Sequence, residues 1–119
     1  MLKAQGFSRE ERVRERKDFE RVFREGRCAR GRFLQVRFVA NGLARSRLGI
    51  ALSRGWKNAV ARNRTKRLIR EAFRTHKAAL PKGLDLIVVP ATNWREPHVE
   101  EIASEIVRLL SRATEGRGS

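Results

Sequence analysis

Cysteine occurs once in this sequence of 119 residues, as Cys28, and tyrosine does not occur at all. A single cysteine excludes an internal disulfide, and with it the cystine framework that stabilises many small secreted domains. No histidine or asparagine adjoins Cys28, so we interpret it as a small buried or edge thiol rather than a nucleophile. We therefore expect a reducing, cytoplasmic environment.

Apolar runs are short as well. No stretch approaches the roughly eighteen apolar residues of a membrane-spanning helix, and the first residues lack the apolar core of a signal peptide. A basic helix can also lie on a membrane surface, but the most basic stretch here has no large aromatic or leucine-rich face to insert. We therefore expect no membrane partner.

Residues that carry chemistry are equally scarce. The only histidines, His76 and His98, have no carboxylate or cysteine partner at the spacing of a metal site or a catalytic triad. No glycine-rich phosphate-binding loop is present. The sequence thus predicts no catalytic residue and no metal site in the chain itself.

Positive charge is what the sequence has in excess, with 28 Lys and Arg against 13 Asp and Glu and a formal net charge of +15. The length predicts one domain over residues 1–119, with a basic N-terminal extension over about 1–16 and a frayed tail over 115–119. Residues 54–77 hold nine basic residues and one acid, whereas residues 84–119 hold four and six. The basic footprint therefore lies in the first two thirds of the chain, and the C-terminal part is interpreted as support.

The most basic stretch, residues 56–74, has the pattern of a one-sided helix. At about 100° per residue, Leu68 and Ile69 fall on an apolar arc of the helix, and a group of mostly basic residues falls on a polar arc of roughly 140°. These are Arg62, Asn63, Lys66, Arg67, Arg70 and Arg74, with Arg64 further round. So much like charge costs self-repulsion, which favours a polyanionic partner over an ordinary solvated face.

A shorter helix is predicted over residues 17–25. Asp18 is a plausible cap, and Gly26 is expected to end the helix in the left-handed conformation. Phe19 and Phe23 form an aromatic ridge one turn apart, either as core packing or as a shelf for unpaired bases. A basic surround for such a shelf is available in Arg12, Arg14, Arg16 and Lys17. A weaker capping box joins Ser8 and Glu11.

The remaining pattern predicts strands and a last helix. Residues 33–40 and 47–53 read as strands joined by an Asn41-Gly42 turn into a hairpin, with residues 27–31 as a short edge strand. Gly49 marks a bulge or a close approach of another backbone. The long helix, capped by Asn58, is expected to run to about Lys77, followed by a buried strand over residues 84–90. Strand, helix and strand form a βαβ unit, and a packing helix follows from Pro97 to about Ala113.

The run NAVARNRTKRLIREAFR, residues 58–74, resembles the RNR signature of the bacterial ribonuclease P protein family. The opening Lys17-Asp18-Phe19 and the strands RLGIALS and DLIVVP match the order of that family's landmarks, so the resemblance covers essentially residues 9–112. It implies an α+β fold of the ribosomal S5 domain 2 type. This is a two-layer α–β sandwich of three helices and a four-stranded mixed sheet, with a left-handed βαβ crossover against the general rule.

The resemblance also implies a function. The family's protein is the accessory subunit of a ribonucleoprotein endoribonuclease that removes the 5′ leader from precursor tRNA. The catalytic RNA holds the Mg²⁺ and performs the hydrolysis, so no cofactor is expected on the protein, which alone is expected to be inactive. One protein per RNA is the default expectation.

The family's functional residues map onto this chain by position. Its RNA-facing helix corresponds to Arg62, Asn63, Arg64, Lys66, Arg67 and Arg70. Its leader-binding cleft corresponds to Phe19, Phe23 and Arg37. Further cations expected to support RNA binding are Arg12, Arg14, Arg16, Lys17, Arg54, Lys57 and Arg74.

This chain departs from the family pattern in three places. Arg37 stands where an aromatic residue is frequent, Trp56-Lys57 where a small residue is common, and Ala91 where a basic one is frequent. Leader binding is therefore expected to depend more on charge, at Arg37, and less on stacking.

Other classes remain open on the residues alone. A general or ribosomal-type RNA-binding protein would share the size and charge. A helix-turn-helix protein would need a short helix before residue 56, where the sequence reads as a strand. An autonomous nuclease would need metal ligands that the sequence does not offer.

Overall fold

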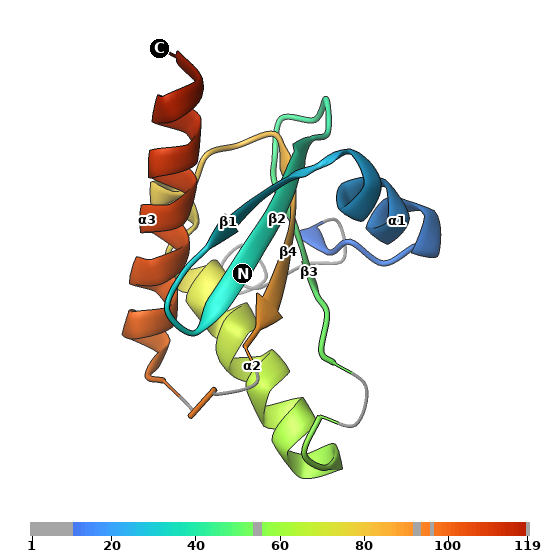
Figure 1. The fold of residues 1–119 in the computed structure, drawn as a ribbon, viewed down its shortest axis with the longest axis vertical. Coiled ribbons are helices and arrows are strands. Elements are labelled where there is room, and N and C mark those ends of the chain that lie inside the picture. The colour runs from blue at the N-terminus through green and yellow to red at the C-terminus, as the bar shows by residue number, and fades with distance from the viewer. Residues whose placement is uncertain (1–10, 54–55, 92–93, 96, 119) are drawn as a thin grey trace, which may run out of the picture.

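The computed structural model describes residues 11–53, 56–91, 94–95 and 97–118, with side chains up to Ala113 (Figure 1). Ser8 of the predicted capping box and Arg54 lie outside the described residues. Among these residues three α-helices, four strands and a short 3₁₀ helix follow in this order: α1 Arg16–Glu25, β1 Arg27–Arg30, β2 Leu34–Ala40, β3 Arg47–Ile50, α2 Ala59–Thr75, η3 Lys77–Ala79, β4 Leu84–Pro90 and α3 Val99–Gly118.

The four strands form one mixed sheet in the order β1-β2-β4-β3. β2 is antiparallel to β1 on one side and to β4 on the other, and β3 is parallel to β4. The predicted hairpin between residues 33–40 and 47–53 is therefore wrong, because β4 lies between the two strands. The apolar run of β4 has to be covered on both faces and paired on both edges, which only a central position provides.

The turn residues of the supposed hairpin serve a wider connection. Gly42 adopts a positive φ of 73°. The backbone N–H of Asn41 donates to the Gly83 carbonyl at 2.9 Å, so the turn is bound to the start of β4 instead of to β3. The chain then passes the start of β4 and enters β3 on the other side of that strand.

The βαβ unit predicted from the sequence is confirmed as β3, α2 and β4. In Figure 1 the chain runs down β3, passes behind the sheet through α2 and returns down β4, which lies on the β2 side of β3. This path is left-handed, as the family resemblance implies.

Helices α2 and α3 pack on one face of the sheet and α1 on the other. Alternate residues of β2, Leu34, Val36 and Phe38, enter the core under α2 and α3, together with Ile69 and Ile106. On the opposite face, Val22 of α1 and Ile87 of β4 are fully buried. The strand period of two thus separates a helix-covered core from the α1 face.

The N-terminal segment is not a detached extension where the structure describes it. Val13 is buried, and its amide donates to the Leu48 carbonyl at 2.9 Å, while Arg12 forms a parallel bridge with Leu48. This segment therefore lies along the free edge of β3 and protects it from pairing with another chain.

Two glycine predictions need correction. Gly26 has φ −80° and ψ 169°, which is extended and not left-handed. A Cβ there would meet the carbonyl oxygen of Val22 and lie 2.8 Å from that of Phe38, so glycine is required by the close packing of α1 on β2. At Gly49 the close neighbour is the Phe19 ring, 2.8 Å from a built Cβ, and not a backbone.

Helix ends differ from the predictions by a few residues. Asn58 caps α2 as predicted, its side chain accepting from the Ala61 amide at 2.8 Å, and α2 ends at Thr75 with η3 behind it. Asp18 lies in the first turn of α1 and Glu15 takes the N-cap position without a side-chain bond. Helix α3 runs to Gly118, past the predicted end at Ala113.

Candidate nucleic-acid interface

Helix α2 presents its cations in a fixed direction because its other side is buried. Ile69, Ala72 and Phe73 enter the core, and Thr65 is buried beside them. Four cations of α2 make no ion pair with any described residue: Arg62, Lys66, Arg67 and Arg70. The unneutralised charge is thus held on a rigid support.

Arg64 and Arg74 stand apart from that group. Arg64 lines a separate hollow at the start of α2 with Asn58 and Val60. Arg74 forms a bidentate ion pair with Glu71, which lowers the pKa of Glu71 and raises that of Arg74, chiefly through their hydrogen bonds. The single acid of the helix therefore neutralises the cation nearest its C-terminal end.

A groove of about 280 Å³ joins α2 to α1 and to the N-terminal segment. Lys66 and Arg70 line it from α2, Arg12 and Arg14 from the segment, and Phe19 from α1. The structure thus brings residues from both predicted sites together, which no local sequence pattern shows.

Like charges lie close together in this groove. Burial lowers the pKa of Arg70, and the positive charge of Arg12 lowers it further. Arg70 remains a cation, since even a lowered guanidinium pKa lies far above neutral pH. Repulsion of this kind is relieved when a polyanion binds between the two side chains.

The aromatic ridge of α1 divides into two roles. Phe19 is half-buried against Gly49, so it is largely a packing residue. Phe23 is 41 % exposed, and the Arg37 guanidinium of β2 lies 4.9 Å from the centre of its ring. Phe23 and Arg37 form an exposed platform that can stack on a base and contact a phosphate.

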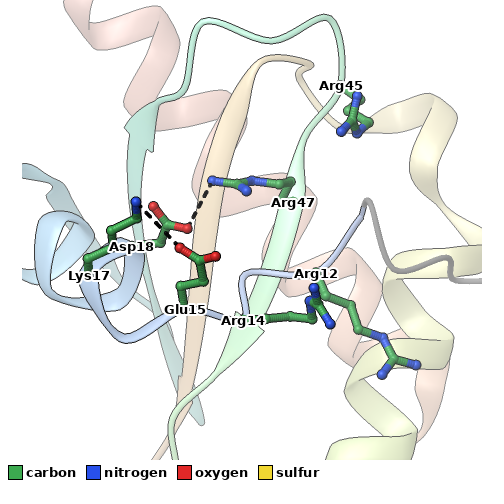
Figure 2. A pocket seen from close by; sticks show the side chains of 7 residues that line it. All are labelled: Arg12, Arg14, Glu15, Lys17, Asp18, Arg45 and Arg47. Atoms are coloured by element: carbon green, nitrogen blue, oxygen red, sulfur yellow. Dashed lines mark ion pairs between the residues drawn. The ribbon is translucent and has the colours of Figure 1, made fainter.

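A second basic pocket lies at the start of α1 (Figure 2), with a volume of about 600 Å³. Its lining residues are Arg12, Arg14, Glu15, Lys17, Asp18, Arg45 and Arg47. Figure 2 shows Arg47 directed at Asp18, 3.7 Å away, and Lys17 at Glu15, 3.6 Å away. Because two of its cations face acids within the pocket, it is less positive than the groove beside α2.

The guanidinium of Arg47 is bound by the buried carboxylate of Asp85. Asp85 of β4 accepts from Arg47 Nε at 2.8 Å and Nη2 at 2.6 Å, and from Asn41 at 3.0 Å, and Arg21 lies 3.7 Å away. Burial acts to raise the pKa of Asp85, but these hydrogen bonds and charges outweigh it and leave the pKa below its usual value. This network joins β3, β4 and α1.

Several predicted supporting cations are engaged elsewhere. Arg16 pairs with Glu20 at 3.3 Å, and both side chains are largely exposed. Lys57, at a positive φ of 38°, donates from Nζ to the Trp94 carbonyl at 2.9 Å. Lys57 therefore links the start of α2 to the 94–95 segment.

Sequence reasoning missed the contribution of residues 45–47, 56 and 94. Trp56, just before α2, and Trp94, between β4 and α3, are only 4 % and 2 % exposed and belong to the core. The only available signal was that tryptophan in a small basic chain rarely stays exposed. The Asp85 network carried no sequence signal, because its members lie far apart in the chain.

The described part of the chain contains neither a cluster of metal ligands nor a helix that could span a membrane. Among those residues no three His, Cys, Asp or Glu side chains gather as a metal site would require. His76 Nε2 lies 3.3 Å from Glu100, an exposed pair with no third ligand. No described helix has the length and apolarity to cross a bilayer.

The fold and the site together define a class: a small basic α+β protein with an unneutralised helix face beside an aromatic–arginine platform, an arrangement suited to a polyanion with unpaired bases. The family model described as Ribonuclease P matches residues 7–114. The chain belongs to the ribonuclease P protein family.

Individual relatives agree with this family. The ribonuclease P protein component of Thermotoga maritima is 44 % identical over 112 residues, covering 91 % of this chain and 96 % of the relative. That of Pelotomaculum thermopropionicum is 36 % identical and covers 85 % and 90 %. The chain is therefore a subunit of a ribonucleoprotein endoribonuclease that acts in tRNA processing, and it associates with the ribonuclease P RNA.

Solved structures show the same fold. The protein from T. maritima superposes with a TM-score of 0.76 at 36 % identity, covering 86 % of this chain and 96 % of that one. The protein from Staphylococcus aureus gives a TM-score of 0.74 at 31 % identity, with 87 % and 94 % covered. The family membership excludes the alternative of a general RNA-binding protein without a processing role.

Proposed function

We propose that this chain binds the catalytic RNA through the basic face of α2 and the 5′ leader of precursor tRNA through the cleft between α1 and the sheet. The observation that carries the leader assignment is the Phe23–Arg37 platform, an exposed ring with a guanidinium stacked 4.9 Å from its centre. The RNA assignment rests on Arg62, Lys66, Arg67 and Arg70, cations that no described acid neutralises.

The two surfaces divide the work physically. Arginine and lysine contacts to phosphates provide affinity that falls steeply with salt. Stacking on Phe23 adds about 1 to 3 kcal/mol per base with little sequence preference, which suits leaders of many sequences. The groove lined by Lys66, Arg70, Arg12, Arg14 and Phe19 lies between α2 and α1, which supports binding of the leader beside the RNA partner, and one protein per RNA stays the default expectation.

Hydrolysis is assigned to the RNA partner. Mg²⁺ belongs in this proposal to that RNA, as the resemblance to the family implies. The protein contributes positive charge that lowers the repulsion between substrate and catalytic RNA, and thereby the magnesium concentration that the reaction needs. A cytoplasmic location remains a prediction from the lone cysteine.

The test is cleavage of precursor tRNA by the cognate RNA at low magnesium, with and without the protein. We expect the protein to stimulate cleavage, and Phe23→Ala to weaken affinity for precursor about tenfold while leaving affinity for mature tRNA unchanged, as the loss of one stacking contact implies. Phe23 is the residue of choice because Phe19→Ala would also open a gap against Gly49.

Leu43→Ala is the matched control, since Leu43 is 40 % exposed against 41 % for Phe23 and lies on a turn outside the cleft. It should leave both affinities unchanged. Absence of stimulation by the wild-type protein would overturn the functional proposal, and an equal loss for precursor and mature tRNA with Phe23→Ala would overturn the leader assignment.

A further inference from the structure

Part of the sheet face that carries Arg37 has no helix over it among the residues that the structure describes. Cys28 pairs directly with Arg37, and Arg30 with Gln35, across the antiparallel β1–β2 ladder. Directly opposed residues of two strands point to the same face, and so do residues two apart on one strand. Arg30, Cys28 and Gln35 therefore lie on the face of the Phe23–Arg37 platform.

Helix α1 covers only one end of this face. It packs over the last residues of β2, where a Cβ at Gly26 would touch Phe38 and where Arg21 donates to the Ala40 carbonyl at 2.5 Å. Figure 1 shows α1 at that end and the connection between β1 and β2 at the other. Arg30 and Cys28 are exposed, and Gln35 is half-buried.

The uncovered area is positive and polar. Neither β1 (RCAR) nor β2 (LQVRFVA) contains an acid. The side chain of Arg30 makes no hydrogen bond or ion pair with any described residue, and the Cys28 thiol on the same face donates to Gln35 Oε1 at 2.8 Å. Arg30 is thus an exposed cation on a face where neither β1 nor β2 supplies an acid.

We propose that the leader path continues from the Phe23–Arg37 platform across this face to Arg30, which contacts a backbone phosphate of the more distant leader nucleotides. Arg30 lies two residues along β1 from the partner of Arg37, about 7 Å further out. No aromatic ring of the described residues is exposed there, so the contact is to phosphate and not to a base. The inference rests on the leader assignment made above.

A different role for Arg30 would be to keep the edge strand from pairing with another molecule. That role predicts self-association when the charge is removed and no dependence on the RNA. The phosphate contact predicts the reverse, a loss that appears only with leaders long enough to reach Arg30.

The experiment uses the assembled holoenzyme and precursor tRNAs that differ only in leader length, from a leader that ends at the platform to one several nucleotides longer. Arg30→Gln should weaken binding several-fold for the long leader only, and should lower the slope of log affinity against log salt by about one unit. Arg112→Gln is the matched control, an exposed arginine of α3 without an ion pair to any described residue. It should leave both leaders unaffected.

Equal affinity of wild type and Arg30→Gln for the long leader would overturn the inference, as would an equal loss for both leader lengths. Sedimentation of the free variant protein shows whether self-association accounts for any loss, and a dimer in place of a leader effect would also overturn it. If Phe23→Ala loses leader affinity and Arg30→Gln does not, only the extension fails. If neither does, the leader assignment itself fails.

Discussion

At the scale of single residues, Asp85 is the group on which most contacts converge, and it is completely buried. Its lowered pKa means that it stabilises the fold above the pKa of the unfolded chain, near 3.8, and that this stability is lost as pH falls through the folded value. Asp85→Asn should lower the free energy of unfolding at pH 7 by about 3 kcal/mol, because the arginines lose their buried partner.

Denaturant unfolding at several pH values measures this effect. The difference between wild type and Asp85→Asn should shrink as the pH drops below the unfolded pKa. Asp18→Asn is the control, since Asp18 lies 3.7 Å from Arg47 and is partly exposed. The Asp18→Asn substitution should lower the free energy of unfolding by less than about 1 kcal/mol. If the stability difference between wild type and Asp85→Asn did not change with pH, the ionised Asp85 carboxylate would not be the source of the stabilisation.

At the scale of elements, α2 combines a stabilising cap with a destabilising charged face. Arg67→Gln with Arg70→Gln should leave the free protein as stable as wild type or slightly more stable, because the half-buried Arg70 is repelled by Arg12 and this repulsion is lost. The same variant should bind the RNA subunit more weakly and lower the salt slope by about two units. Thermal unfolding and filter binding measure the two properties.

The cap offers the opposite pattern on the same helix. Asn58→Ala removes the acceptor for the Ala61 amide and should cost about 1 kcal/mol of stability. Its RNA affinity should be close to that of wild type at temperatures where it is folded. If the arginine variant proved strongly destabilised, α2 would be a structural helix and its charge would not be a binding feature.

At the scale of the whole molecule, a formal net charge of +15 on 119 residues opposes the compact state. Raising NaCl from about 0.05 M to about 0.5 M screens this repulsion, so the Tm of the free protein should rise by several degrees. Over the same range the affinity for the RNA subunit should fall by orders of magnitude.

Calorimetry of the free protein and of the complex separates the two effects, because the complex should lose stability with salt while the free chain gains it. Sodium sulfate at equal ionic strength controls for specific anion binding. A free protein whose Tm falls with salt would show that its ion pairs outweigh its net repulsion.

Much of the molecule follows from the sequence alone. The helical arc of residues 56–74, the cap at Asn58 and the apolar run Leu84–Pro90 determined α2 and β4, because each depends on neighbours a few residues apart. The RNR pattern likewise carried the family, and with it the left-handed crossover, which runs against the usual handedness.

Tertiary structure alone decided how these elements meet. The strand order places β4 between β2 and β3, so the Asn41-Gly42 turn does not form the hairpin that its sequence favours. Contacts between distant segments pack Phe19 and leave Phe23 exposed. The pairing of β1 with β2 likewise places Arg30 on the face of Arg37. Such contacts are set by the burial of whole faces, whose free energy no local pattern contains.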